Sequence, residues 1–253
     1  MRRVVIISDT QIPYEDKRAL QNVIGFIKQT KPAEVVHVGD LMDFPQPSTW
    51  SKATRAEFEG SIYQDSELGK KYLAELREAY SGPIKVIEGN HDLRPRAYLA
   101  KYAPALAESR DFDLDQLLDF QAYDVTLIKG FYDITQDWTI THGHLGFSIS
   151  HIAGRTAQNA ANKIGKSVAM GHTHRLAISR ESFGYQGKIS TLTGFEVGHL
   201  CDLKKAHYLK NGGANWQQGF GVLDIDGSYV HPQGIPIHKD KTFSVDGFKY
   251  GGK

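Results

Sequence analysis

The chain has 253 residues, enough to bury a sizeable core, and its 40% hydrophobic and 23% charged residues are typical of a globular protein rather than a disordered one. A formal net charge of +1 gives the protein no strong overall attraction to a nucleic acid or to an anionic membrane surface. The single cysteine, Cys201, excludes an intramolecular disulfide and is taken to exclude a cysteine-based metal site, so we expect any metal to be bound by Asp, Glu, Asn and His.

The N-terminus carries an apolar run, 4–7, that is too short for the core of a signal peptide. No stretch approaches the roughly 20 apolar residues of a membrane span. We therefore expect a cytoplasmic protein without a membrane partner. The sequence has no internal repeat and no long low-complexity linker, and we expect a single domain over 1–253.

The first part of the chain reads as alternating strands and helices. Short apolar runs predict buried strands at 3–7, 34–38 and 84–87. Apolar residues at helical spacing predict two helices between these strands, one carrying Leu20, Val23, Ile24 and Ile27 and the other Leu68, Tyr72, Leu76 and Ala79. This alternation indicates α/β architecture.

The rest of the chain becomes rich in predicted strands. Leu114, Leu117 and Leu118 indicate a short helix, and an Ala-rich helix is predicted over 152–164. Strands are predicted at 125–128, 138–141, 167–170, 176–179, 188–193, 219–224 and 229–237. The C-terminal part, 175–253, is thus β-rich, with a long loop at about 195–218. Two packed sheets with helices outside them would accommodate both parts of the chain.

Polar side chains of metal-ligand type follow five of the predicted strands. They are Asp9, then Gly39-Asp40, then Gly89-Asn90-His91-Asp92, then His142-Gly143-His144, and then Gly171-His172-Thr173-His174. In open α/β sheets, ligands bind beyond the carboxyl ends of the strands, where residues far apart in sequence meet. Glycines beside the candidate ligands allow tight turns and close approach of the backbone.

The types of donor favour a particular chemistry. Carboxylate, amide oxygen and imidazole together suit Mn²⁺, Fe or Zn²⁺ better than Ca²⁺ or Cu(I). Two such cations roughly 3.5–4 Å apart can hold a phosphate and activate a water. Each motif alone has an ordinary structural explanation, such as a helix cap at Ser8-Asp9 or a turn at Gly39-Asp40. Their joint occurrence at successive strand ends favours a metal site.

The ordered series of these motifs resembles the calcineurin-like metallophosphoesterases, and it is most similar to small phosphodiesterases of the bacterial and phage type. The resemblance covers residues 4 to about 180. It implies a four-layer α/β/β/α sandwich of two mixed sheets, with the metal site at the carboxyl-terminal edge of the strands.

The resemblance also implies a role for each motif residue. Asp40 would bridge two metals, Asp9 and His174 would bind the first, and Asn90, His142 and His172 would bind the second. His91 would contact the phosphate and protonate the leaving oxygen, with Asp43 orienting its ring. His144, two residues beyond a proposed ligand, is a further candidate for substrate contact.

The chain departs from the family pattern at Gln11 and Phe44. The family usually has Asp-x-His where this chain has Asp9-Thr10-Gln11, so Gln11 is expected to bind the first metal more loosely or through a water. Phe44 replaces the arginine that grips phosphate in the protein phosphatases of the family, which argues against a phosphoprotein substrate. Two divalent ions are expected, Mn²⁺ by preference, with Fe, Zn²⁺ or Ni²⁺ as alternatives.

Three functions remain in competition. The preferred one is a dinuclear phosphodiesterase that hydrolyses nucleotides or similar small diesters with a metal-bridging water. A DNA or RNA nuclease of the same family is an alternative that the near-neutral charge disfavours. A non-catalytic binding scaffold is the third, favoured by Gln11 alone. The expected partner is a phosphodiester, by preference a nucleotide, and a homo-oligomer is left open. His37 is expected to be packed in its strand, and His199 and His207 are open to placement in the pocket or on the surface.

Overall fold

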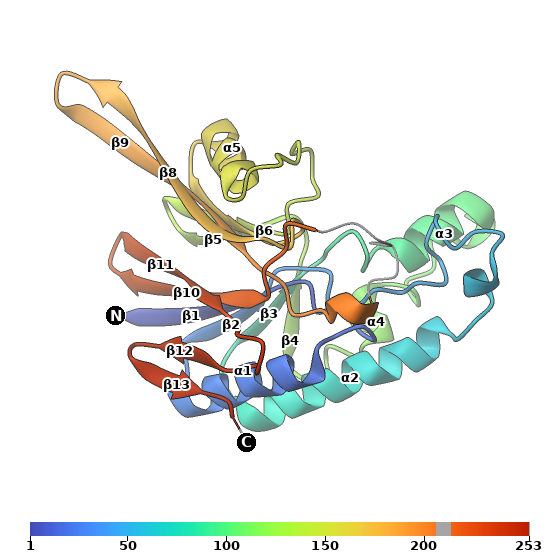
Figure 1. Cartoon of the computed structure of the whole chain (residues 1–253). Coiled ribbons are helices and arrows are strands. Elements are labelled where there is room, and N and C mark those ends of the chain that lie inside the picture. The colour runs from blue at the N-terminus through green and yellow to red at the C-terminus, as the bar shows by residue number, and fades with distance from the viewer. Residues whose placement is uncertain (206–213, 253) are drawn as a thin grey trace.

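A computed structural model describes residues 1–205 and 214–252 of the chain (Figure 1). The helices are α1 (Lys17–Thr30), α2 (Ile62–Ala79), α3 (Arg94–Tyr102), α4 (Leu114–Leu117) and α5 (Arg155–Ile164). The strands are β1 (Arg2–Ile7), β2 (Glu34–His37), β3 (Ile84–Ile87), β4 (Val125–Ile128), β5 (Phe131–Thr135), β6 (Trp138–Thr141), β7 (Ser167–Met170), β8 (Leu176–Tyr185), β9 (Lys188–Val197), β10 (Gly219–Asp226), β11 (Tyr229–Pro236), β12 (Phe243–Val245) and β13 (Phe248–Tyr250). Short 3₁₀ turns lie at Arg55–Glu57, Pro104–Leu106 and Leu203–Lys205.

Two large mixed sheets form the body of the protein. The first has the order β11-β10-β1-β2-β3-β4, in which β1 to β4 run parallel and β10 and β11 run antiparallel to their neighbours. The second has the order β5-β6-β7-β9-β8, with β6, β7 and β9 parallel. Strands β12 and β13 make a separate small hairpin.

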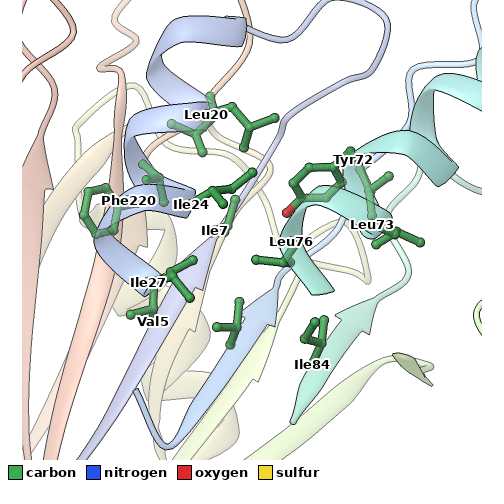
Figure 2. Close-up of a cluster of buried hydrophobic side chains, with 14 of the residues drawn as sticks. Val5, Ile7, Leu20, Ile24, Ile27, Tyr72, Leu73, Leu76, Ile84 and Phe220 are labelled. Atoms are coloured by element: carbon green, nitrogen blue, oxygen red, sulfur yellow. The ribbon is translucent and has the colours of Figure 1, made fainter. Parts of the chain in front are cut away.

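Three apolar clusters define four layers. One lies between the first sheet and helices α1 and α2 (Figure 2). A second lies between the two sheets, and a third joins α5 to the second sheet. Strand β1 shows how the layers are built, because Val5 and Ile7 face the helices while Val4 and Ile6 face the other sheet. The expected α/β/β/α sandwich is thus confirmed.

Helix α1 illustrates why the predicted helices form. Asp16 caps its N-terminus by accepting a hydrogen bond from the backbone N–H of Ala19 at 3.1 Å, and Lys31 ends it in a left-handed conformation. The apolar residues predicted to share one face, among them Leu20, Val23 and Ile27, are buried against the sheet. Propensity, capping and burial therefore agree in this element.

Some predicted boundaries were wrong. The predicted helix over 152–164 begins only at Arg155, because Gly154 lies in a left-handed conformation with φ of +80°. The long loop expected at 195–218 begins later, since Phe195 and Val197 are fully buried within β9. Strands β8 and β9 extend well beyond the predicted 176–179 and 188–193 as a long hairpin that projects from the second sheet (Figure 1). Helix α3 and strands β5, β12 and β13 were not predicted.

Among the described residues, no helix combines the length and the apolar character needed to cross a bilayer.

Candidate metal centre

The side chains predicted to bind metals come together at one end of the two sheets. Strands β1, β2 and β3 are parallel neighbours, so the residues that follow them, Asp9, Asp40 and Asn90, lie along one edge. Strands β6 and β7 are parallel neighbours in the second sheet and are followed by His142 and His172. One carboxylate oxygen of Asp40 and one nitrogen each of His142 and His172 lie within 4.8 Å of one another, which joins the two sheets at this point.

His142 is oriented by the backbone of the neighbouring sheet. Its Nδ1 lies 2.7 Å from the carbonyl oxygen of Val38, and in this arrangement Nδ1–H donates to that oxygen. The other nitrogen, Nε2, then carries a lone pair and faces Asn90 Oδ1 at 3.1 Å and Asp40 Oδ2 at 3.3 Å. A ring held by one nitrogen so that the other is free is the usual state of a metal-binding histidine.

This arrangement fits a divalent cation. With Nδ1–H of His142 bonded to the Val38 carbonyl, Nε2 of His142 and Oδ2 of Asp40 both carry lone pairs and Asn90 presents its amide oxygen beside them, so the three atoms can share a cation. A proton can serve: burial by itself would lower the pKa of His142, but the carboxylates of Asp40 and Asp9 raise it to about 9. A metal ion would take the place of that proton.

A second group of donors surrounds Asp9. Its Oδ1 lies 3.0 Å from Nε2 of His174 and has no hydrogen-bond donor, although the atom is fully buried. The side-chain nitrogen of Gln11 lies 3.3 Å from the same His174 nitrogen. Because a half-turn about the last side-chain bond exchanges the two ends of the amide group, Gln11 can equally present its oxygen there. Gln11 thus contacts this group of donors.

The backbone is strained at this end of the sheets. Asp9, Asp40, His172 and His174 have φ values of +49°, +50°, +68° and +58°, in the left-handed region that residues with a side chain rarely occupy. Each such residue costs on the order of 1 kcal/mol or more, and such residues cluster at functional sites. The surrounding structure holds these four side chains in place against that cost.

Two glycines allow the strand ends to approach closely. A Cβ atom on Gly89 would lie 2.2 Å from both the backbone nitrogen and Oδ1 of Asp40. A Cβ on Gly171 would lie 2.0 Å from the hydroxyl oxygen of Ser8 and 2.8 Å from Oδ2 of Asp9. Any larger residue at either position would therefore push a candidate ligand out of place.

His91 lies beside the candidate metal ligands, and its ring is held by a carboxylate. Its Nδ1 is 2.7 Å from Asp43 Oδ1, and its Nε2 is 3.7 Å from Asp40 Oδ2. Burial by itself would lower the pKa of His91, but Asp40 and Asp43 together raise it above its usual value. The predicted pair of His91 and Asp43 is thus brought together.

Asp92, the last residue of the Gly89–Asp92 motif, ties two loops together. Its Oδ1 accepts a hydrogen bond from the backbone N–H of Met42 at 2.9 Å, and its Oδ2 accepts one from the N–H of Gly89 at 2.8 Å. The backbone N–H of His91 donates to Asp40 Oδ1 at 2.8 Å. The loops after β2 and β3 therefore keep a fixed distance from each other.

His144 and His37, two further histidines of the sequence analysis, differ in position. His144 is half-buried, its ring lies 5.3 Å from that of His142, and its buried Nδ1 has no partner. His37 is buried within β2 and lies 3.0 Å from the hydroxyl of Thr10, as expected of a packed histidine. Burial lowers the pKa of His37 to about 3, so this ring stays neutral.

Arg94 is a residue of this site that the sequence analysis missed. Its Nη1 donates to the carbonyl oxygen of Asp43 at 2.6 Å, and its Nη2 lies 3.2 Å from Nε2 of His91. Its position three residues after His91, at the start of α3, places the guanidinium beside that ring. Because helix α3 was not predicted, the sequence analysis had no reason to place Arg94 next to His91.

Cys201 was missed as a part of this end of the molecule, and for His199 the sequence analysis left both a pocket and a surface position open. His199 is fully buried, so the surface placement left open for it is excluded, and its ring stacks on His174 with centroids 5.4 Å apart. His174, His199 and Cys201 form a second group whose donor atoms lie within 4.8 Å of one another. The sequence analysis expected no cysteine in a metal site because the chain has one cysteine, yet that cysteine lies in this mixed group of candidate donors. His207 lies outside the described residues.

Comparison with known proteins agrees with this geometry. Residues 2–176 match the family model of the calcineurin-like phosphoesterases. The chain belongs to this family. Two relatives, each named Gene 54 protein, come from Mycobacterium phage D29 and Mycobacterium phage L5. They are 49% and 48% identical to the chain and are matched over 97% of both sequences.

Two solved structures that align with the chain over most of its length have low sequence identity to it. Vacuolar Protein Sorting 29 from Cryptosporidium parvum is 15% identical with a TM-score of 0.49, covering 99% of this chain and 98% of that one. Yfce, a phosphoesterase from E. coli, is 16% identical with a TM-score of 0.43, covering 91% and 98%.

Proposed function

We propose that this phosphoesterase is a metal-dependent phosphodiesterase that binds two divalent cations and hydrolyses nucleotides or similar small diesters. The observation that carries the proposal is the convergence of Asp40 Oδ2, Asn90 Oδ1 and His142 Nε2, three atoms that can share a cation. The His91–Asp43 pair next to them supplies a group that can transfer a proton. We further propose that 1–253 acts as one domain, since β10 and β11, from the C-terminal part, complete the first sheet beside β1.

Two sets of residues would hold the cations. Asp9 and His174, with Gln11 beside them, would hold the first, while Asn90, His142 and His172 would hold the second, and Asp40 would be shared. Mn²⁺ is the preferred ion, because the donors are carboxylate, amide and imidazole. When bound, the cations supply Lewis acidity toward the phosphate and make a bound water a better nucleophile.

The residues of the chain itself account for the proton that the leaving group requires. His91 can donate it to the departing oxygen, while the carboxylate of Asp43 accepts from Nδ1 and keeps the ring in one orientation. Arg94 lies 3.2 Å from Nε2 of His91, on the nitrogen that faces away from Asp43. Its guanidinium would stabilise negative charge on a phosphate oxygen at that point.

The charge around His91 favours a diester over a monoester. Arg94 is partly neutralised, because its Nη1 also lies 3.2 Å from Asp43 Oδ2. Phe44 is fully buried and offers nothing to a phosphate. A diester carries one negative charge and a monoester carries up to two, so a site whose arginine is already paired suits the diester.

Hydrolysis of bis-p-nitrophenyl phosphate and p-nitrophenyl phosphate, measured side by side with added Mn²⁺ and with EDTA, tests the proposal. We expect turnover that needs the metal and favours the diester. A preference for the monoester would refute the diester assignment. Absence of turnover in protein shown to contain its metals would refute catalysis and favour a binding scaffold.

A further inference from the structure

A segment behind His174 closes one side of the candidate metal centre. It follows β9 and carries His199 and Cys201. The backbone N–H of Leu200 donates to the carbonyl of Asp9 at 3.2 Å, and the N–H of Gly219 donates to the carbonyl of His199 at 3.1 Å. A bridge between Glu15 and Cys201 fixes the end of the segment. The segment is therefore held against the loop that carries Asp9.

The side chains of this segment present nitrogen and sulfur toward His174. Cys201 Sγ lies 3.2 Å from Nδ1 of His199, and both residues are at least 99% buried. The His199 ring stacks on that of His174 at an interplanar angle of 29°. Trp216 packs on His174 as well, with ring centroids 4.0 Å apart. The cluster is thus enclosed.

Two nitrogen atoms in this cluster lack a hydrogen-bond partner. They are Nε2 of His199 and Nδ1 of His174, and both are buried. Leaving a buried polar atom without a partner costs roughly 1–3 kcal/mol, so such atoms usually have a function or a bound group. The two histidines that carry these atoms form a group with Cys201, in which one donor atom from each residue lies within 4.8 Å of the others.

We propose that His174, His199 and Cys201 bind a soft divalent cation such as zinc, with Cys201 binding as a thiolate. Zinc takes imidazole and thiolate at about 2.0–2.1 and 2.3 Å, which in tetrahedral geometry separates nitrogen and sulfur by roughly 3.5 Å. The observed 3.2 Å between His199 Nδ1 and Cys201 Sγ is close to that value. The donor set around Asp40 contains no sulfur and suits Mn²⁺, whereas a set that joins Cys201 and His199 to His174 selects a softer ion on the His174 side of the centre.

Binding exchanges the thiol proton of Cys201 for the cation and releases the proton to solvent. Without a cation the residue is a neutral thiol, because burial raises the pKa of Cys201. A buried thiol beside a neutral imidazole is the competing explanation of the cluster, and it predicts no bond between sulfur and a metal. The two explanations therefore differ in a spectroscopic property.

Replacement of bound metal by Co²⁺ separates them. A thiolate bound to Co²⁺ gives a sulfur-to-metal charge-transfer band in the near ultraviolet, whereas oxygen and nitrogen ligands do not. Cys201 is the single cysteine of the chain, so such a band can come from no other residue. We expect the band in the wild-type protein. Its absence from protein that contains Co²⁺ would overturn the proposal.

Variants assign the band to this cluster. Cys201→Ser should abolish it, and His199→Gln should weaken or shift it, while His231→Gln, a matched change at an exposed histidine, should leave it unaltered. Retention of the band in Cys201→Ser would overturn the assignment. Circular dichroism of each variant establishes that it is folded.

X-ray absorption at the zinc edge needs no variant and covers the case in which Cys201→Ser does not fold. With one equivalent of Zn²⁺ bound to wild-type protein, we expect a sulfur scatterer at about 2.3 Å. A shell of nitrogen and oxygen alone would refute the proposal. That result would leave the proposed phosphodiesterase untouched, because it is tested by turnover with Mn²⁺.

Discussion

Replacing His91 by glutamine tests the proposed proton donor. Glutamine is close to histidine in size and can still hydrogen-bond to Asp43, which lies 2.7 Å from the His91 ring. It cannot give up a proton. Because His91 is not among the proposed metal ligands, the variant should keep both cations and lose only the proton transfer.

The expected loss follows from what remains around the leaving oxygen. Removing a general acid lowers kcat by about 10²–10⁴, which corresponds to roughly 3–5 kcal/mol in the barrier. Arg94, 3.2 Å from Nε2 of His91, stays in place and still stabilises negative charge. The loss should therefore be near the low end for p-nitrophenolate, which departs without a proton, and near the high end for an alkoxide.

The assay compares two diesters in the wild-type and variant proteins. Bis-p-nitrophenyl phosphate has a good leaving group, and a dinucleotide leaves a sugar hydroxyl. Metal content is measured on the same samples by mass spectrometry. His151→Gln, at an exposed position, controls for the loss of an imidazole elsewhere. The proton-donor role would be refuted if His91→Gln had the same kcat on the dinucleotide as the wild-type protein. It would also be refuted if the variant lost the same factor in kcat on both substrates.

Three further changes test the metal centre. Asp40→Asn should weaken the binding of both cations, because this carboxylate is proposed to be shared, and unchanged stoichiometry on metal analysis would contradict that role. Gln11→His should tighten binding of the first cation, since residue 11 lies 3.3 Å from His174, and an unaltered affinity in calorimetric titration would remove Gln11 from the centre. Gly89→Ala should lower both the melting temperature and the metal content, because the added Cβ would lie 2.2 Å from the backbone of Asp40. Gly25→Ala is its control, with nothing within 4 Å of the added Cβ in the middle of α1, and should raise helix stability by about 1 kcal/mol.

The residues at the strand ends could be read from the sequence because the signal is local. A buried strand is a short apolar run, and the polar residue that ends it is adjacent in the chain, as with Asp9 after β1. Parallel pairing then brings such ends together whatever the details of the connections. This explains why the proposed ligands and His91 lie together as expected.

The extent of β8, the helix α3 and the positions of His199 and Cys201 could not be predicted from the sequence, because tertiary contacts determine them. Half of β8 is exposed at the end of a projecting hairpin, so it shows no apolar run beyond Ser179. Helix α3 buries only Pro95 of its residues and has no apolar face to detect. His199 and Cys201 follow no pattern, since their position against His174 depends on how a single loop packs.

The position of β1 in its sheet has a consequence for how the chain is made. β1 is synthesised long before β10, yet one of its two edges pairs with β10, with Arg2 opposite Ile225. Translation at roughly 5–20 residues per second leaves that edge open for on the order of ten seconds or more before β10 emerges. During this time an apolar strand, Val4 to Ile7, offers unpaired backbone groups to any other strand. Completion of the first sheet is thus coupled to the synthesis of β10, and a chain that stops before Gly219 exposes an edge prone to aggregation.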